Sequence, residues 1–224
     1  MTAVSSTPTT DDVRRRLEIV RNRIADAGAD PLAVTVVGVT KGFGPNAVRA
    51  GLGAGLNAIG ENYADELVAK AADAGLEGQS VAWHFLGPLQ TNKINRLRPI
   101  VACWQSVDSV HRAEALAKRA PGANVLVQVR LDEAAGRAGV VRREVAELVR
   151  TARDFGLDVG GLMGVAPVDP VAARRGFEAL VDEAERLALP VRSIGMSDDL
   201  EIAVQAGSTM VRVGTALFGR RPPQ

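Results

Sequence analysis

A regular alternation of short apolar runs and longer helical patterns constrains the fold of this chain more than any other feature. Eight of the short runs are predicted strands, at residues 34–40, 58–61, 82–87, 103–108, 124–131, 159–165, 192–197 and 210–215. Helical patterns separate them, at about residues 45–54, 63–74, 92–97, 110–120, 142–155, 170–187 and 198–206. Continuous apolar strands that alternate with helices indicate a parallel sheet covered on both sides.

Eight such units within 224 residues predict an α/β protein folded as a single (β/α)8 TIM barrel. An open doubly wound sheet is the alternative architecture. Residues 30–220 contain no linker, so we expect residues 9–220 to form a single domain. Residues 1–8 are predicted to be a flexible tail, and the residues after 220 a second short tail.

An extra helix is predicted ahead of the first strand. Val13, Leu17, Val20 and Ile24 recur at spacings of four, three and four. This spacing places them on one face of a helix. Gly28 follows directly and is typical of a helix end.

The charge balance excludes some classes of function. A net charge of +1 argues against a dedicated nucleic-acid binder, because binding to a phosphate backbone needs a basic excess. Cys103 is the single cysteine, which excludes an internal disulfide, and we expect no metal site. No apolar run approaches a membrane span, and the N-terminus lacks the layout of a signal peptide. We therefore expect a cytoplasmic protein.

The C-terminal third ends two predicted strands in small and hydroxyl residues. One strand ends at Gly195-Met196-Ser197 and the other at Gly214-Thr215. In a barrel, phosphate groups often bind at the loops after the last two strands, where helix starts expose backbone N–H groups. Ser197 has an equally simple interpretation as the N-cap of the helix that follows it.

Lys41 closes the first predicted strand, and its position suggests chemistry. At a barrel mouth its ammonium is partly desolvated, which lowers its pKa and allows the amine to form an imine. A phosphate cradle and an amine together indicate a phosphorylated aldehyde as ligand. A lysine that reaches solvent is the ordinary alternative.

Three further polar residues lie at strand ends or inside strands. Arg212 must have a partner, because an unpaired buried guanidinium is very costly. That partner is either a carboxylate such as Glu61 or a ligand. Asn62 is either a ligand contact or a helix cap. His84 is either an acid/base group or a structural histidine, whereas His111 is expected at the surface.

These motifs resemble the pyridoxal 5′-phosphate homeostasis proteins, also described as the proline synthetase co-transcribed family. The resemblance covers residues 34–219 in order and rests on Lys41, Gly60-Glu61-Asn62-Tyr63, residues 83–93, Gly161-Leu162-Met163, Gly195-Met196-Ser197-Asp198-Asp199-Leu200-Glu201 and residues 207–219. It implies a barrel like the N-terminal domain of alanine racemase. It also implies that pyridoxal phosphate is carried as an imine on Lys41.

By the same resemblance, Ser197, Gly214 and Thr215 bind the cofactor's phosphate. Arg212 is expected to face the pyridine nitrogen, and Asn62 to lie beside the ring. These residues agree with the positions inferred from the strand ends.

The chain departs from the family pattern at two places. The family usually has Ser-Lys-Thr around the imine lysine, where this chain has Thr40-Lys41-Gly42. After the fifth strand, Arg137 stands where the family has a lysine. A role for a second lysine in cofactor transfer is therefore doubtful here.

The resemblance favours a carrier that maintains pyridoxal phosphate homeostasis over an enzyme. A racemase needs an acid/base group on each face of the substrate's α-carbon, and we expect no second domain to supply one. An arginine at the pyridine nitrogen also weakens the cofactor as an electron sink. We expect a monomer that passes the cofactor to apoenzymes. The alternatives are a racemase-like amino-acid enzyme that uses His84 or Tyr63, and an imine-forming phosphosugar aldolase.

Overall fold

The computed structural model describes residues 8–76, 78–132 and 138–221, and it forms a closed barrel of parallel strands. Each strand pairs with the next along the chain, and β8 pairs with β1. The strands are β1 Thr35–Val39, β2 Ala58–Glu61, β3 Ala82–Phe85, β4 Val101–Val107, β5 Asn124–Arg130, β6 Asp158–Val165, β7 Val191–Ser193 and β8 Met210–Val213. The predicted barrel is confirmed, and the open doubly wound sheet is excluded.

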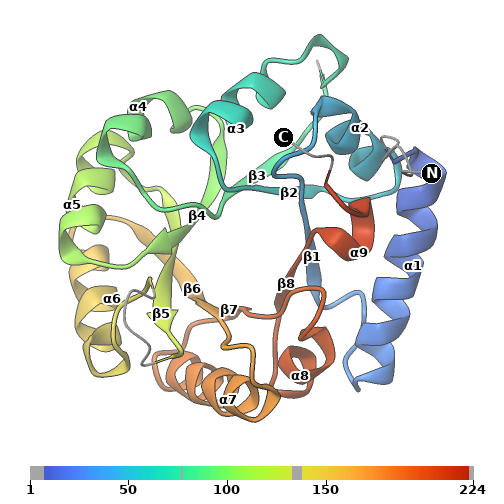
Figure 1. The fold of residues 1–224 in the computed structure, drawn as a ribbon. Coiled ribbons are helices and arrows are strands. Elements are labelled where there is room, and N and C mark those ends of the chain that lie inside the picture. Colours follow the sequence, from blue (N-terminus) through green and yellow to red (C-terminus); the bar gives the residue numbers. More distant parts are fainter. Residues whose placement is uncertain (1–7, 77, 133–137, 222–224) are drawn as a thin grey trace.

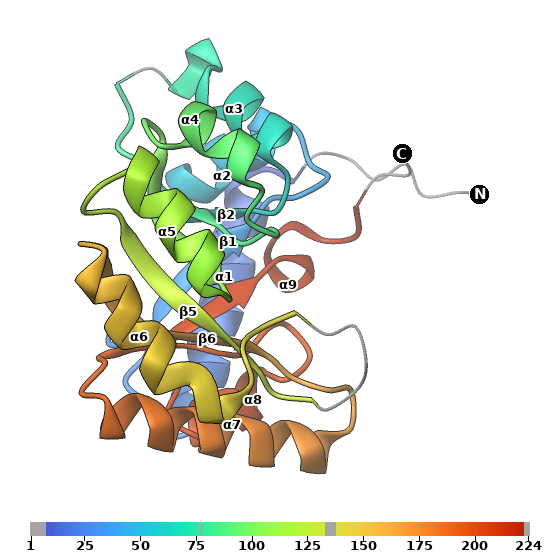
Figure 2. The ribbon, with the colours of Figure 1, turned by 90° about the vertical axis from the view of Figure 1, so that its left-hand side faces the viewer.

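Helices surround the strands on the outside (Figure 1). The α-helices are α1 Thr10–Asp26, α2 Pro45–Gly53, α3 Ala64–Ala71, α4 Ile94–Leu97, α5 Val110–Arg119, α6 Val145–Asp154, α7 Pro170–Arg186, α8 Leu200–Gln205 and α9 Thr215–Phe218. Among the described residues, short 3₁₀ turns are η1 Ala74–Leu76, η2 Thr91–Lys93 and η3 Arg142–Glu144. Figure 2 shows that α9 lies at one end of the barrel and not on its outer wall.

The extra N-terminal helix is confirmed as α1. Thr9 caps it through a reciprocal capping box with Asp12, which satisfies backbone N–H groups at the helix start. The helix ends where Gly28 takes a φ of 97°, a conformation that glycine adopts without a steric cost. The four predicted apolar residues are all buried.

The apolar side chains form two separate cores, because successive residues of a strand point to opposite faces. One core lies between the strands and the helices and contains most of the buried residues. The smaller core fills the inside of the barrel, and its members are Val37, Ala58, Cys103, Leu126, Met163 and Met210. The barrel is therefore packed at one end, and the polar site begins above this small core.

The last two strands are shorter than predicted. β7 ends at Ser193, and Gly195, two residues later, takes a φ of 97°. β8 ends at Val213, because the carbonyl of Gly214 accepts helical hydrogen bonds from Leu217 and Phe218. Thr215 is therefore the first residue of α9 instead of the last residue of a strand.

The structure bears on two further expectations, the N-terminal tail and the absence of a membrane span. Of the tail predicted at residues 1–8, residues 1–7 lie outside the described residues. Within the part of the chain that the structure describes, no helix combines the length and apolar character needed to cross a bilayer.

Candidate functional site

The period-two alternation of the strands directs the predicted site residues to one place. On β8, Met210 belongs to the inner core, so Arg212 points into the barrel as well. On β1, Val37 belongs to the same core. Every second residue after it faces the same way, so Val39 and then Lys41, two residues past the end of the strand, are directed toward the barrel axis. On β2, Ala58 leads in the same way to Asn62.

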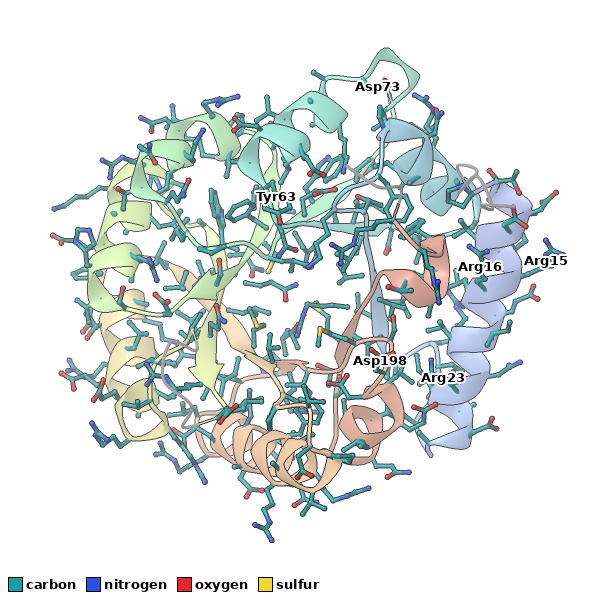
Figure 3. All side chains as sticks on the ribbon, in the orientation of Figure 1. Arg15, Arg16, Arg23, Tyr63, Asp73 and Asp198 are labelled. Carbon is teal, nitrogen blue, oxygen red and sulfur yellow. The ribbon has the colours of Figure 1, made fainter. Side chains whose placement is uncertain are left out.

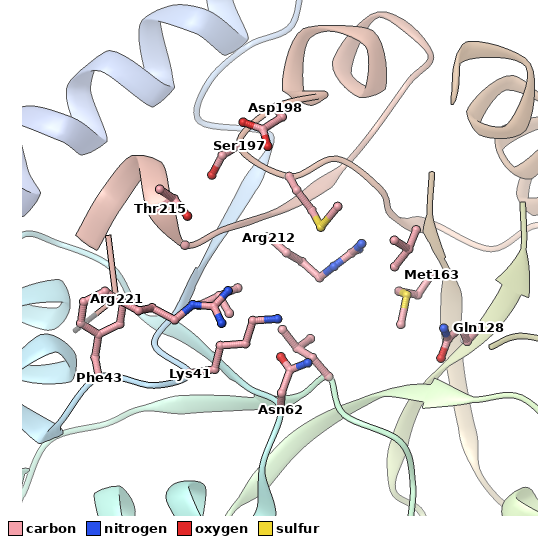
Figure 4. A pocket seen from close by; sticks show the side chains of 15 residues that line it. Lys41, Phe43, Asn62, Gln128, Met163, Ser197, Asp198, Arg212, Thr215 and Arg221 are labelled. Carbon is pink, nitrogen blue, oxygen red and sulfur yellow. The ribbon is translucent and has the colours of Figure 1, made fainter. Parts of the chain in front are cut away.

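These side chains line a cavity of about 310 Å³ at the carboxyl ends of the strands. All six predicted cofactor-binding residues are among its lining residues, which are Val39, Lys41, Phe43, Asn62, Leu86, Gln128, Met163, Val165, Met196, Ser197, Asp198, Arg212, Gly214, Thr215 and Arg221. Figure 4 shows Lys41, Asn62 and Arg212 pointing into this pocket, with Ser197 and Thr215 together at one side.

Lys41 is half-buried, and its environment favours the neutral amine. Desolvation lowers the pKa of Lys41, and the positive charges of Arg221 and Arg212 lower it further. The carboxylate of Glu61 acts in the opposite direction but does not outweigh them. A lysine that can lose its proton is a competent nucleophile toward an aldehyde.

A buried ion pair behind the strands holds the end of β1. Lys70 of α3 donates to Glu61 Oε1 at 2.6 Å and to the carbonyl oxygen of Thr40 at 2.8 Å. The Thr40 hydroxyl donates to the same Glu61 oxygen at 2.6 Å. The residue that precedes Lys41 is therefore fixed to both β2 and α3.

Arg212 is buried, and its hydrogen-bond acceptors are neutral. Its Nη1 donates to the carbonyl oxygen of Ser193 at 2.5 Å and to the Ser193 hydroxyl at 2.7 Å, and its Nη2 donates to the Gly164 carbonyl at 2.8 Å. Burial lowers the pKa of Arg212 to about 10, so it stays charged at neutral pH. The salt bridge to Glu61, an alternative that the sequence suggested, is wrong. Glu61 follows the inward-facing Gly60 in β2, so its side chain points away from the barrel axis and pairs with Lys70.

A chain of buried side chains continues from Arg212 across the barrel. The Ser193 hydroxyl donates to Gln105 Oε1 at 2.7 Å, and Gln105 Nε2 lies 2.6 Å from His84 Nδ1. Burial lowers the pKa of His84 to about 4, so its neutral ring accepts from the amide. His84 is therefore a structural residue of this network, and it is not among the described residues that line the pocket.

The residues of the predicted phosphate cradle lie where the β7–α8 loop meets α9. The Ser197 hydroxyl accepts from the backbone N–H of Ala216 at 3.2 Å. Ser197 does not cap α8, because that helix begins at Leu200 and Asp199 occupies the N-cap position. The interpretation of Ser197 as a helix cap is therefore wrong. Ser197, Gly214 and Thr215 are brought together instead.

Asn62 also does not cap a helix. α3 begins at Ala64, and Tyr63 occupies its N-cap position, so Asn62 lies one residue too early. Gly87, after β3, packs directly against it: a Cβ at position 87 would lie 1.8 Å from the Asn62 carbonyl oxygen. The glycine therefore allows the end of β2 to approach the next loop closely.

Several pocket residues were not predicted. Gln128 is a polar side chain within an apolar strand, the same signal that identified Arg212, and strand alternation could have found it. Arg221 lies past residue 220, where the predicted domain ends, yet it lines the pocket. No sequence signal places Arg221 beside Lys41, because the return of the chain end to β1 is a tertiary contact. Arg137 lies outside the described residues.

Comparison with known proteins identifies the family. Residues 9–222 match the family model of the alanine racemase N-terminal domain. The chain is 36% identical to the pyridoxal phosphate homeostasis protein of Pseudomonas aeruginosa, and the match covers 90% of this chain and 91% of that protein. The protein of the same name from Deinococcus radiodurans is 38% identical, with 89% and 95% covered. The chain belongs to the pyridoxal phosphate homeostasis family. The resemblance seen in the sequence is thus confirmed.

Solved structures agree with the fold. A structure described as an unknown protein from Bifidobacterium adolescentis superposes with a TM-score of 0.84 at 27% identity, covering 96% of this chain and 99% of that one. PipY of Synechococcus elongatus, solved with PLP bound, gives 0.74 at 29% identity and covers 89% and 100%. An alanine racemase of Clostridium difficile gives 0.73 at 14% identity and shares the fold alone; the match covers 94% of this chain and 58% of the racemase.

Proposed function

We propose that this protein binds pyridoxal 5′-phosphate through Lys41 and acts as a cofactor carrier that maintains pyridoxal phosphate homeostasis. The observation that carries the proposal is the single pocket that unites an amine of lowered pKa, a buried guanidinium and two hydroxyl side chains. The PLP-bound structure of PipY and the names of the curated relatives support the same ligand.

Lys41 is the residue for covalent attachment. Desolvation and the nearby arginines lower the pKa of its amine, which would hold the ligand's aldehyde carbon through a C=N bond in place of the C=O bond, with the aldehyde oxygen released as water. Hydrolysis of such a bond would return the free lysine and the free cofactor, which suits storage and release. The cluster of Thr40, Glu61 and Lys70 supports this role by fixing the backbone next to Lys41.

Arg212 is the residue for the pyridine nitrogen. A guanidinium is a donor without an acceptor and keeps its proton at neutral pH. Three hydrogen bonds to neutral oxygens hold its Nη atoms in place. An arginine facing the ring nitrogen would leave that nitrogen unprotonated, so the electron withdrawal that the cofactor supplies would be weaker.

Ser197, Gly214 and Thr215 are the residues for the phosphate. Two hydroxyl groups and the backbone at the start of α9 offer neutral donors, which suits a phosphate dianion. Asn62 completes the wall beside the ring. Residues 9–220 act together as one cofactor-binding domain in this proposal, with Arg221 added from beyond that boundary.

The proposed carrier works without classical catalysis. The two acid/base candidates of a racemase-like enzyme, His84 and Tyr63, are absent from the described residues that line the pocket. His84 is bonded to Gln105, and Tyr63 is 54% exposed. This arrangement supports cofactor holding over proton transfer at a substrate carbon. Delivery to apoenzymes, a monomeric state and a cytoplasmic location stay predictions.

The visible absorption spectrum of the purified protein tests the proposal. We expect an imine band in the wild type with pyridoxal phosphate and its loss in Lys41→Ala. Lys118→Ala is the matched control, because Lys118 is an exposed lysine of α5. Absence of the band after addition of pyridoxal phosphate would refute the proposal and leave the phosphosugar aldolase. Turnover of a panel of amino acids would favour the racemase-like enzyme.

A further inference from the structure

Helix α1 lies outside the eight strand–helix units of the barrel, but it packs against the two helices that flank the phosphate cradle. It contacts α8 and α9 along one side. Arg16 and Arg23 are seven residues apart, so they lie on one face of the helix, two turns apart. Figure 3 shows both on the side that faces α8 and α9, whereas Arg15 points outward.

Arg23 binds the β7–α8 loop and the first turn of α8 at the same time. Its Nε donates to Glu201 Oε1 at 2.6 Å, and its Nη2 donates to Glu201 Oε2 at 2.8 Å. The same Nη2 donates to the carbonyl oxygen of Ser197 at 2.9 Å. One guanidinium therefore fixes the backbone of the residue whose hydroxyl faces the cradle.

Arg16 makes the corresponding contact with the other half of the cradle. Its Nη1 donates to the carbonyl oxygen of Leu217 in α9 at 3.1 Å. That helix begins at Thr215. The two arginines thus attach both pieces of the cradle to one rigid helix.

Charge gives Arg23 a second effect on the cradle. Asp198 lines the pocket, and Glu201 follows it in the first turn of α8, so two carboxylates lie near the place proposed for a phosphate dianion. Arg23 interacts electrostatically with both. Without its positive charge, these carboxylates would repel the phosphate more strongly.

We propose that α1 braces the phosphate-binding side of the pocket and that Arg23 is a positioning residue for the ligand's phosphate. This inference rests on the proposed function, and it concerns a residue that touches the cradle and not the ligand. Its signature is selective: Arg23 affects ligands that carry the phosphate and leaves the aldehyde and ring interactions unchanged.

The experiment compares pyridoxal phosphate with pyridoxal, which lacks the phosphate. Dissociation constants for both are measured from the imine absorption band in the wild type, Arg23→Met and Arg15→Met. Arg15 is the matched control, because its side chain is 73% exposed and pairs with Asp12 on the same helix. We expect Arg23→Met to raise the dissociation constant of pyridoxal phosphate about tenfold and to leave that of pyridoxal unchanged. This is the loss typical of one hydrogen bond to a charged group, here the bond from the displaced Ser197 hydroxyl to the phosphate.

Equal weakening of both ligands, or no weakening of either, would overturn the brace. If Arg23→Met does not fold, Arg23→Lys replaces it, since an ammonium keeps the charge but reaches fewer acceptors, and a smaller loss with the same selectivity is expected. A wild type that gives no imine band with pyridoxal phosphate would overturn the proposed function. If the wild type gives the band but the ratio of the two dissociation constants is the same in Arg23→Met as in the wild type, the role of α1 is refuted and the proposed function stands.

Discussion

Removing the Lys70 ammonium should destabilise the protein by an amount that depends on pH. In Lys70→Met the side chain keeps a similar length, but Glu61 loses the cation that lies 2.6 Å from its Oε1. Glu61 is fully buried, and its Oε2 already lacks a hydrogen-bond partner among the described residues. Breaking a buried ion pair on one side costs about 3–5 kcal/mol.

The electrostatic part of this loss has an upper limit, because Glu61 can take up a proton. Burial already raises the pKa of Glu61 above its ordinary value of 4.5, and loss of Lys70 raises the pKa further. Protonating a carboxyl group of that ordinary pKa costs about 3.4 kcal/mol at pH 7 and about 0.7 kcal/mol at pH 5. A carboxyl group with a raised folded-state pKa is favoured at low pH, so the variant regains stability as the pH falls.

Urea unfolding at pH 7 and pH 5 measures this difference. We expect the free energy of unfolding of Lys70→Met to approach that of the wild type at pH 5. Lys118→Met is the control: Lys118 forms an exposed pair with Glu114, and its loss should cost under about 0.5 kcal/mol at either pH. The double variant Lys70→Met/Glu61→Gln should show no such pH dependence. An equal loss for Lys70→Met at both pH values would refute the reasoning.

Three further predictions follow from buried groups near the site. Burial lowers the pKa of His84 to about 4, so between pH 6.5 and 4 the unfolded state binds more protons than the folded state. As the pH is lowered through this range, the free energy of unfolding should decrease by at most about 1.36 kcal/mol per pH unit. Urea unfolding should show a smaller decrease in His84→Gln. Burial raises the pKa of the Cys103 thiol to about 12, so a disulfide-exchange reagent should label it only after denaturant is added, and rapid labelling of the native protein would contradict this. Gly87→Ala should destabilise the protein by about 1–3 kcal/mol and weaken cofactor binding, because its Cβ would displace Asn62; unchanged thermal unfolding would be inconsistent with this contact.

The alternation of strands and helices was sufficient to predict the barrel. Each strand is buried on both faces and therefore appears in the sequence as a continuous apolar run. The same reading identified Lys41, Asn62 and Arg212. All three continue the inward-facing positions of their strands, and a polar residue there requires a partner. The pocket brings them together with Ser197, Gly214 and Thr215.

Predictions that depended on contacts between elements succeeded less well. The alternative interpretation of Ser197 as a cap of the next helix was wrong, because the sequence does not tell how far a loop runs before a helix begins. Glu61, the alternative partner considered for Arg212, was also wrong, because Glu61 points to the outside of β2 and pairs with Lys70. Both errors arose where a side chain had several possible neighbours.

The sequence by itself determined the order of strands and helices, since local periodicity encodes it. Only the tertiary structure decided that Arg221 lies beside Lys41, that Lys70 neutralises Glu61, and that Arg23 fixes the Ser197 loop from a helix outside the repeat. The physical reason is distance along the chain. Residues separated by as many as 201 positions, such as Arg16 and Leu217, meet through packing, and no local pattern in the sequence encodes such a contact.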